Sequence, residues 1–550
     1  MSVQDRATGL FVLMLVLVGW LWPRIFASGF AAFENFGVRL ATRKRLAILV
    51  VALAPVLVRV SLLPILSVPL PYTQDEFSYL LAADTFAHGR LANPPHPMWV
   101  YLDTFHVNQH PTYSSIYPPA QGAALAVGEL LGNSWTGVLL TTALMCGAGL
   151  WAMQGWLPAP WALLGAMLLA LRLGIFGYWA NSYWGGQVAA FGGALVIGAL
   201  PRILHFHRAR DAIMLGLGMA ILANSRPFEG LIFCVPVLVA LVVWLCGRRS
   251  PRWRETLSRV TLPVCAVMLL CLSFMGYYNW RLTGNPIRFA YVVNVRSHFA
   301  VPQLAWEKTV APFHFLNPQF ESYYNVWWPS HAWAYGRPNT IEHISLALAR
   351  DAQTFSGYFL WPELCIAVIA LPWLIRDRRV RFLILQLALC IAGFVAVAMF
   401  LPHYAAPLTA TTFILVAQAF RHIRLWRFGP RPVGIGVTRM TGLAALLLIP
   451  LHPWPAVQQQ SARNRAEFAR MLEAKPGKQL VIVRYSPLHY IHAEWVYNKA
   501  DIDNAKIVWA REIPGISMQP LLDYFHERKV WLVEPDLAPR ERIGTNNAPE

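Results

Sequence analysis

Charged residues are scarce in this chain of 550 residues: only 13% are charged, whereas 56% are hydrophobic. A typical soluble domain carries about 25% charged residues. The mean hydropathy of +0.42 reflects the same shortage. This composition excludes a water-soluble enzyme and a disordered scaffold, and it indicates an integral membrane protein.

Acidic residues are the rarer charged type, with 28 Asp and Glu against 46 Lys and Arg, a formal charge of +18. In a soluble chain such an excess suggests a nucleic-acid partner. Here the bases form short clusters at the ends of apolar stretches, such as Arg43-Lys44-Arg45 and Arg376 to Arg381. The positive-inside rule places such clusters in the cytoplasm. The charge is therefore an orientation signal, and nucleic acid is excluded as a partner.

The apolar stretches are about long enough to cross a bilayer, and they predict about twelve transmembrane helices. These are expected near residues 8–26, 46–70, 134–155, 158–180, 185–201, 211–226, 228–246, 260–279, 357–375, 381–401, 404–421 and 438–454. Arg59 and Arg172 lie inside two of these stretches, where a charge is costly, so we expect them to be paired structurally or to snorkel to the interface, and not to act in catalysis.

This topology leaves three large pieces outside the cytoplasm. They are a first external loop (71–133), a second external loop (280–356) and a C-terminal domain (455–550), and residues 1–454 form the transmembrane domain. All seven cysteines lie in or beside apolar stretches, and the chain has no Asn-x-Ser/Thr sequon. External loops without disulfides or glycosylation sites favour a bacterial or archaeal cell membrane. We expect a bacterial inner membrane, with the active site and the C-terminal domain on the periplasmic or external side.

The last hundred residues have a different pattern. Helices are expected at 462–474 and 518–528, and strands at 479–485, 505–510 and 529–534. Strands that alternate with helices predict a small α/β domain with a parallel sheet. No Gly-rich turn follows a strand and no GxxxxGK[ST] motif is present, so nucleotide binding is not supported. The fold class is thus an all-α polytopic membrane protein with a small C-terminal extracytoplasmic α/β domain.

The start of the first external loop carries the most chemistry. Thr73 and Glu76 have the spacing of a helix capping box, which is enough to explain Glu76. The box does not need Asp75. A short helix would place Asp75 and Tyr79 on one face, where the carboxylate could accept a proton from a substrate hydroxyl.

Three short motifs in this chain resemble those of the GT-C glycosyltransferases. The acidic pair Asp75-Glu76 follows an early span, Ile116-Tyr117-Pro118-Pro119-Ala120-Gln121-Gly122 leads into a later apolar segment, and Leu401-Pro402-His403-Tyr404-Ala405-Ala406-Pro407-Leu408 lies in a late span. The chain is most similar to the dolichyl- or polyprenyl-phosphate-mannose protein mannosyltransferases and to the aminoarabinose transferases. The resemblance covers about the first 420 residues as topology, but only these motifs as sequence.

The resemblance implies an inverting transfer of a sugar from a polyprenyl phosphate to an external hydroxyl. Asp75 would be the catalytic base, and Glu76 either a helix cap or a ligand of the acceptor. Tyr79, Tyr117, Glu229 and Tyr404 are expected to line the substrate site, together with the basic residues considered next. The chain has Phe77-Ser78-Tyr79 where the mannosyltransferases have a nearby His, which leaves a lipid, a glycan or a protein open as the acceptor.

Basic residues near the external ends of spans are candidates for the donor phosphate. An external transferase needs a donor that arrives in the membrane, and the departing phosphate needs a cation. Arg226, which lies near Glu229 between two spans, suits a phosphate through its bidentate fork. A membrane-end turn in which Arg226 pairs with Glu229 is the alternative. His403 is the second candidate, on the family pattern.

Other residues leave alternatives open. Asp103, His106 and His110 would share one face of a helix and are weak candidates for a divalent metal, the one cofactor that the sequence suggests, although Pro111 breaks the segment and no known ligand spacing is matched. The stretch from Trp306 to Trp333 is rich in aromatic residues that could stack on sugars, contact acyl chains or belong to an interfacial helix. Gly192-Gly193 predicts close packing of helices.

A membrane glycosyltransferase is the leading interpretation of these features. A transporter or flippase for a lipid-linked sugar would need an inverted repeat with broken helices, which the sequence does not show. A non-enzymatic envelope assembly protein would leave Asp75 replaceable.

Overall fold

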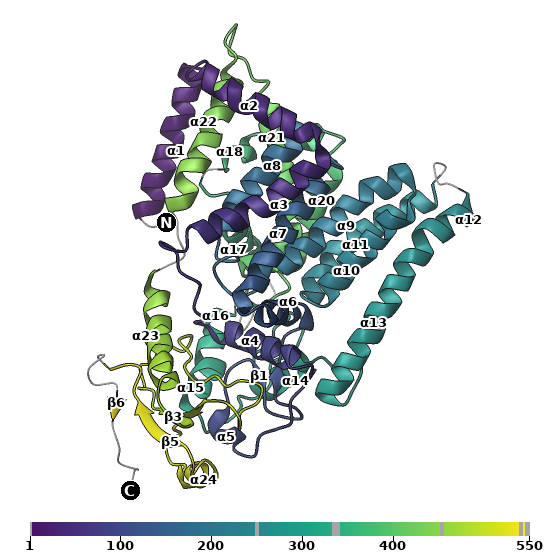
Figure 1. Ribbon diagram of the computed structural model, residues 1–550. Coiled ribbons are helices and arrows are strands. Elements are labelled where there is room, and N and C mark those ends of the chain that lie inside the picture. The colour runs from purple at the N-terminus through teal and green to yellow at the C-terminus, as the bar shows by residue number, and fades with distance from the viewer. Residues whose placement is uncertain are drawn as a thin grey trace.

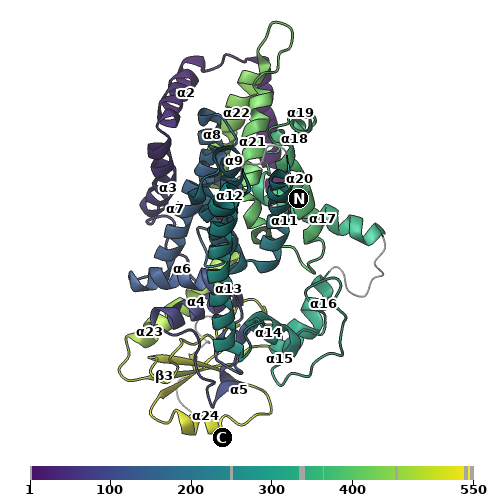
Figure 2. The same ribbon diagram turned by 90° about the vertical axis from the view of Figure 1, so that its right-hand side faces the viewer.

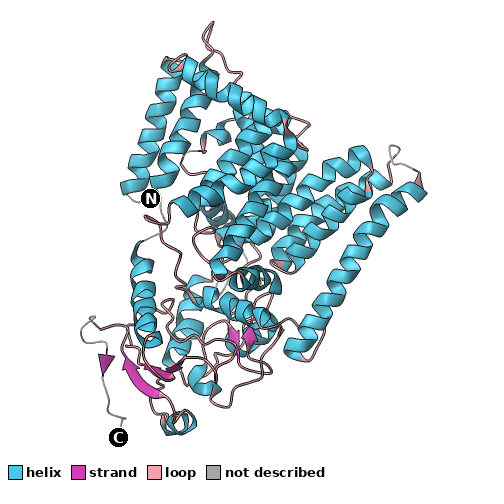
Figure 3. Cartoon of the chain, in the orientation of Figure 1, coloured by secondary structure: helices cyan, strands magenta, loops and turns pink. Residues whose placement is uncertain are grey.

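The computed structural model describes residues 3–247, 252–332, 341–362, 364–451, 456–537 and 543–544. A large bundle of helices occupies one end of the molecule, and a smaller region that contains all the labelled strands occupies the other (Figures 1 and 3). The expected boundary between residues 454 and 455 lies outside the described residues, as does Trp333.

The bundle consists of helices from most of the chain. They are α1 (Val3–Leu21), α2 (Ala27–Thr42), α3 (Lys44–Ser61), α7 (Ser134–Met153), α8 (Ala159–Leu169), α9 (Gly186–Phe206), α10 (Ala209–Ala223), α11 (Pro227–Leu245), α12 (Trp253–Thr256), α13 (Leu262–Thr283), α17 (Ile341–Phe359), α18 (Ile366–Ile369), α19 (Leu371–Arg376), α20 (Arg381–Phe394), α21 (Thr409–Ile423) and α22 (Val433–Leu448). Four described helical segments are long and apolar enough to cross a membrane: α7, α9, α11 and the segment from α12 to α13. The number of twelve spans stays a prediction.

Two parts of the bundle differ from the expected spans. The stretch 357–375 is divided among the end of α17, α18 and α19, and Pro372 lies in the first turn of α19. Proline has no N–H to continue a helix, which explains the break before α19. Helix α2, which contains Glu34 and Arg39 within an otherwise largely apolar sequence, was not expected. In the structure Glu34 is paired with Arg424 and Arg439 at 2.9 and 3.0 Å.

Short helices and a small hairpin lie at the other end of the bundle. They are α4 (Gln74–Ala87), α5 (Trp99–Leu102), β1 (Val107–Asn108), β2 (Ser114–Ser115), α6 (Pro119–Leu130), α14 (Ala290–His298), α15 (Pro318–Phe320) and α16 (Trp328–His331). In both views α4 and α6 lie between the bundle and the C-terminal strands (Figures 1 and 2). The first external loop is therefore the layer that joins the two regions.

The C-terminal residues form a four-stranded sheet with two helices. The elements are α23 (Ala456–Glu473), β3 (Gln479–Val483), β4 (Ile507–Arg511), α24 (Gln519–Tyr524), β5 (Lys529–Val533) and β6 (Ile543–Gly544). The strand order is β4-β3-β5-β6; β3 pairs parallel with β4 and β5, and β6 pairs antiparallel with β5. The three predicted strands, the two predicted helices and the parallel pairing are thus confirmed, whereas β6 was not expected.

The two faces of this sheet are covered by different partners. Val481 and Trp509 pack on one face with Phe468 of α23. On the other face Leu480 and Val508 share one apolar core with residues of the first external loop. The loop residues in that core are Leu81, Tyr101, Leu102, Val107 and Tyr113. A strand buried on both faces reads as a continuous apolar run, as Gln479–Val483 does after its first residue.

Candidate active site

Glu76 fixes the start of α4. Its Oε2 accepts hydrogen bonds from the backbone N–H groups of Tyr72 at 2.9 Å and Thr73 at 3.2 Å, and its Oε1 accepts one from Tyr183 at 3.0 Å. The side chain is only 5% exposed. Burial raises the pKa of Glu76, although the backbone hydrogen bonds oppose that shift. Both oxygens are occupied by backbone donors, so Glu76 is the helix cap, which was one of its two expected roles.

Asp75 is the acidic residue that stays accessible, with 30% of its side chain exposed. Its Oδ1 lies 3.1 Å from Nδ1 of His106 and accepts a hydrogen bond from the hydroxyl of Tyr117. Burial alone would raise the pKa of Asp75. The charge and hydrogen bond of His106 and the hydrogen bond of Tyr117 nevertheless hold it well below its usual range. Asp75 is therefore a carboxylate across the physiological pH range.

His106 reaches Asp75 through an unusual backbone conformation. Its φ is +58°, in the left-handed region that non-glycine residues rarely adopt and that is enriched at functional sites. The hydroxyl of Ser78 donates a hydrogen bond to its backbone carbonyl at 2.6 Å. Its Nε2 lies 3.4 Å from the hydroxyl of Tyr323 in the second external loop. The loop around β1 thus carries His106 to the start of α4, where it bridges Asp75 and Tyr323.

Tyr79 lies on the same face of α4 as Asp75, as its i, i+4 spacing predicted. Its ring stacks on the ring of Tyr117 with centroids 4.4 Å apart, while the Tyr117 hydroxyl contacts Asp75. Burial raises the pKa of Tyr79 to about 12, so its hydroxyl stays a neutral donor. Tyr117 therefore joins the first two motifs of the sequence in one site.

Arg226 enters this site from the N-cap position of α11. Its guanidinium carbon lies 4.8 Å from the centre of the Tyr404 ring. Its charge acts on Tyr79, Glu229, Tyr404 and Tyr117. Glu229, in the first turn of α11, is 7% exposed. Among the described residues Arg226 makes no direct ion pair, so its guanidinium is not occupied by Glu229.

His403 and Tyr404 lie in a 3-10 helix, Pro402–Leu408. Nδ1 of His403 is 2.8 Å from the hydroxyl of Tyr178. The segment is held close to α9 because Gly193 has no side chain: a Cβ there would lie 2.1 Å from the carbonyl oxygen of Pro407. The predicted close approach at Gly193 thus holds the third motif against α9.

The C-terminal region also contributes a side chain. Nδ1 of His492 lies 2.9 Å from Nε2 of Gln74, the residue before Asp75. His492 contacts Trp327 and Tyr323 of the second external loop, with ring centroids 4.6 and 6.0 Å apart. Burial lowers the pKa of His492 to about 4, so its imidazole is neutral at pH 7. One wall of the site is thus shared by three parts of the chain.

The structure brings most of the predicted site residues together. Asp75, Tyr79, Tyr117, Arg226, Glu229, His403 and Tyr404 converge, whereas the three weak metal candidates do not. His106 is bonded to Asp75, Asp103 lies near Arg511, and His110 is exposed beside Trp99. No group of three His, Cys, Asp or Glu side chains suited to a metal occurs in the described ranges.

Four contributors were not expected: His106 as a partner of Asp75, Tyr178, Tyr323 and His492. Only Tyr323 had a signal in the sequence, as part of the aromatic stretch. There Trp327 stacks between Tyr323 and His331, with centroids 5.2 and 4.3 Å apart. The stretch therefore forms a stacked column at the edge of the site, and only its outer member His331 is exposed.

No family model matches this chain, and no curated protein matches its sequence. Solved structures of similar fold include ArnT from Cupriavidus metallidurans bound to undecaprenyl phosphate, at 14% identity and a TM-score of 0.41, covering 82% of this chain and 83% of that chain. The same ArnT in the apo state gives 14% identity and a TM-score of 0.44 over 90% and 93% of the two chains.

Another similar structure is the archaeal oligosaccharyltransferase AglB from Archaeoglobus fulgidus with an inhibitory peptide and a dolichol-phosphate, at 12% identity and a TM-score of 0.45 over 82% and 64% of the two chains. These neighbours are GT-C glycosyltransferases, the superfamily that the motifs resemble. At such identities and TM-scores the likeness carries no argument about the activity of this chain.

Proposed function

We propose that this protein is a membrane glycosyltransferase that moves a sugar from a polyprenyl-phosphate-linked donor to a hydroxyl of an acceptor. The observation that carries the proposal is the convergence of a carboxylate and a guanidinium in one aromatic site. The charges of Asp75 and Arg226 both act on Tyr79 and on Tyr404, and the Arg226 guanidinium lies over the Tyr404 ring. A transfer from a phosphate donor needs both groups, a proton acceptor and a cation for the leaving phosphate.

In the proposed reaction the acceptor hydroxyl donates its proton to Asp75 as its oxygen attacks the anomeric carbon of the donor. The bond from that carbon to the phosphate oxygen breaks on the opposite face, so the configuration inverts. The polyprenyl phosphate leaves with the bonding electron pair and is stabilised by the bidentate fork of Arg226. In a transition state with oxocarbenium character the bond to the leaving group weakens before the acceptor oxygen bonds to carbon, so a strong base is not needed to remove the acceptor proton. A carboxylate of low pKa such as Asp75 is therefore sufficient.

His106 and Tyr117 act as positioning residues in this scheme. Both donate to Oδ1 of Asp75, which leaves Oδ2 for the acceptor hydroxyl. His403, which is bonded to Tyr178, completes the donor side. Residues 1–454 would form the transmembrane domain, and the loops at 71–133 and 280–356 and the domain at 455–550 would face the periplasm or exterior of a bacterial cell.

The test of this proposal is Asp75→Asn in purified protein reconstituted in lipid nanodiscs. The assay measures transfer of radiolabelled sugar from a panel of polyprenyl-phosphate hexoses and pentoses to an envelope extract. We expect Asp75→Asn to lower transfer at least a thousandfold without changing the elution profile of the protein.

The matched control is Asp523→Asn, at an exposed carboxylate on α24. It should transfer at the rate of the unmodified protein. Near-normal transfer by Asp75→Asn would remove Asp75 from the reaction. Absence of transfer from every donor by the unmodified protein would contradict the proposed function itself.

A further inference from the structure

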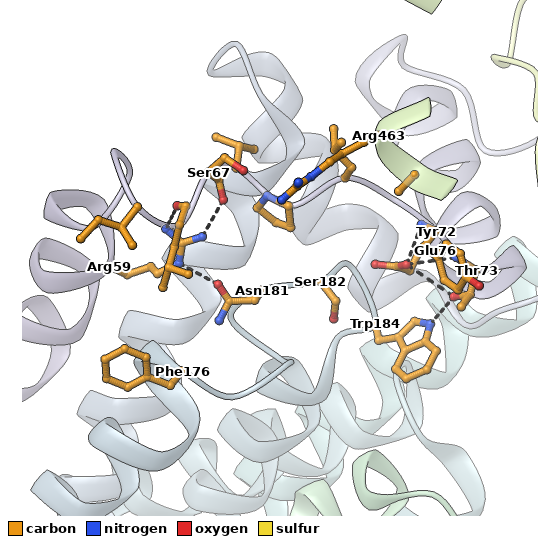
Figure 4. A pocket seen from close by; sticks show the side chains of 16 residues that line it. Arg59, Ser67, Tyr72, Thr73, Glu76, Phe176, Asn181, Ser182, Trp184 and Arg463 are labelled. Atoms are coloured by element: carbon orange, nitrogen blue, oxygen red, sulfur yellow. Dashed lines mark hydrogen bonds between the residues drawn. The ribbon is translucent and has the colours of Figure 1, made fainter. Parts of the chain in front are cut away.

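A pocket of about 120 Å³ lies between the end of α3 and the start of α4 (Figure 4). Its polar lining residues include Tyr72, Thr73 and Ser182. Its apolar lining residues include Ile65, Leu66 and Leu70, which follow α3 in the chain. The lining is therefore amphipathic, and the space is large enough for several water molecules or a small polar group.

Trp184 separates this pocket from the active site. Its indole Nε1 donates a hydrogen bond to Oγ1 of Thr73 at 3.0 Å, and its ring centroid lies 5.1 Å from that of His403. Glu76 lines the pocket as well, but its carboxylate is held by three backbone N–H groups. The pocket thus lies across Trp184 from His403 and is a site distinct from that of Asp75.

Ser182 is the polar group of this pocket that most needs a ligand. Its side chain is 5% exposed, and its hydroxyl has no hydrogen-bond partner among the described residues. A buried hydroxyl without a partner is unfavourable, and such groups commonly mark the position of a ligand or a water molecule.

Two arginines give the pocket a positive potential. Arg59 lies in its wall with its guanidinium bonded to Asn181 at 2.7 Å and to two backbone carbonyls. Arg463, an exposed residue of α23 in the C-terminal region, extends over the pocket (Figure 4). These cations outnumber the single carboxylate of Glu76, so the pocket favours an anion.

An apolar track runs from the pocket along the outer face of α3. Ile65 is 81% exposed and Leu70 is 40% exposed at the rim. Further along, Leu49, Leu53 and Leu57 are 54%, 45% and 67% exposed. Their spacing of four residues places them on one face of the helix. A hydrocarbon chain lying on this face would lead its polar end to the pocket.

We propose that this pocket binds the phosphate-bearing headgroup of an anionic phospholipid, whose acyl chain lies along α3. The phosphate is held near Arg463, and the hydroxyl of Ser182 donates a hydrogen bond to the headgroup. This lipid is a resident partner separate from the sugar donor. It would brace the start of α4, because Tyr72 and Thr73 belong both to this pocket and to the cap of α4.

Native mass spectrometry of the full chain in detergent tests this proposal with dioleoylphosphatidylglycerol as the probe. We expect retention of one or more lipids per chain. Arg463→Gln should lower the retained fraction at least fivefold and Ser182→Ala about twofold. The control Arg470→Gln removes the same charge two turns further along α23, from an exposed residue that does not line the pocket, and it should retain the lipid.

Two further probes define the ligand. Dioleoylglycerol, which lacks the phosphate, and glycerol 3-phosphate, which lacks the chains, should both be retained at least fivefold less than the phospholipid. Equal retention of either probe would overturn the proposal, as would equal lipid retention by Arg463→Gln and Arg470→Gln. Loss of undecaprenyl phosphate but not phosphatidylglycerol in Arg463→Gln would also overturn it, because the pocket would then belong to the donor.

Discussion

Nε2 of Gln74 lies 2.9 Å from Nδ1 of His492, although the two residues are 418 positions apart in the chain. Gln74 is 1% exposed and precedes Asp75 directly. The C-terminal region is therefore bonded to the residue that adjoins the proposed base, and it forms part of the site's wall.

This contact predicts a role for His492 in orienting the acceptor. His492→Ala should lower the transfer rate about tenfold, equivalent to about 1.4 kcal/mol of activation free energy. The reason is that the substitution removes the imidazole that forms the wall of the site next to Trp327. Retention of undecaprenyl phosphate should not change. The comparison is with His526→Ala, an exposed histidine that bonds only within its own turn. If both variants transfer at the same rate, His492 has no part in the reaction.

Arg226 is expected to hold the donor phosphate. Arg226→Ala should lower the retention of undecaprenyl phosphate, measured by native mass spectrometry, at least tenfold. Arg226→Lys should retain an intermediate amount, since an ammonium cannot bind a phosphate through a bidentate fork. Arg281→Ala, at an exposed arginine near the end of α13, serves as the control. Unchanged retention in Arg226→Ala would remove Arg226 from the donor site.

Glu76 is expected to act on stability. In Glu76→Gln one carboxylate oxygen becomes an amide NH₂, which faces a backbone donor instead of accepting from it. The free energy of unfolding should fall by about 1–3 kcal/mol, and the midpoint of thermal unfolding should fall with it. The control is Glu467→Gln at an exposed position of α23. An unchanged midpoint in Glu76→Gln would show that the three backbone hydrogen bonds contribute little.

Asp103 predicts a dependence of stability on pH. Burial raises its pKa from 3.8 to about 7, and the hydrogen bond from Gln109 and the charge of Arg511 only partly oppose this. Between these two values the folded chain holds a proton that the unfolded chain has lost. The stabilisation that comes from this retained proton is therefore complete below about pH 4. It is lost as the pH rises from there through 7, by at most about 1.4 kcal/mol per pH unit.

Thermal unfolding at pH 5, 6, 7 and 8 checks this dependence. Asp103→Asn should unfold with a smaller slope against pH than the unmodified protein. Asp501→Asn should leave the slope as it is, because the ordinary pKa of that exposed carboxyl, 3.8, already lies below the measured range and hydrogen bonds from Asn504 lower it further. Identical slopes for Asp103→Asn and the unmodified protein would contradict the assignment.

Short sequence signals were sufficient to predict the start of α4 and the strands of the C-terminal sheet. The cap of α4 depends on Thr73 and Glu76, three residues apart, and the strands of the C-terminal sheet depend on short apolar runs. The convergence of Asp75, Arg226 and His403 was expected from their positions at the external ends of spans and, for His403, from the resemblance to a family, since nothing local relates residues so far apart.

His106 shows why the rest could not be predicted. Its contact with Asp75 depends on a left-handed backbone conformation, which is uncommon for a residue other than glycine and which no local sequence signal marks here. The sequence placed it instead in a helix with Asp103 and His110. The division of residues 357–375 has a simpler reason, because the hydropathy of a segment does not register the break that a proline introduces.

The shared apolar core between the C-terminal sheet and the first external loop also has a consequence in time. Leu480 and Val508 are synthesised about 400 residues after Leu81 and Tyr101, with which they pack. During translation the loop that carries Asp75 must therefore wait, with part of its apolar surface uncovered, until nearly the whole chain has been made. The site can be complete only in a finished molecule, so an interrupted chain would have the acidic motif but no assembled site around it.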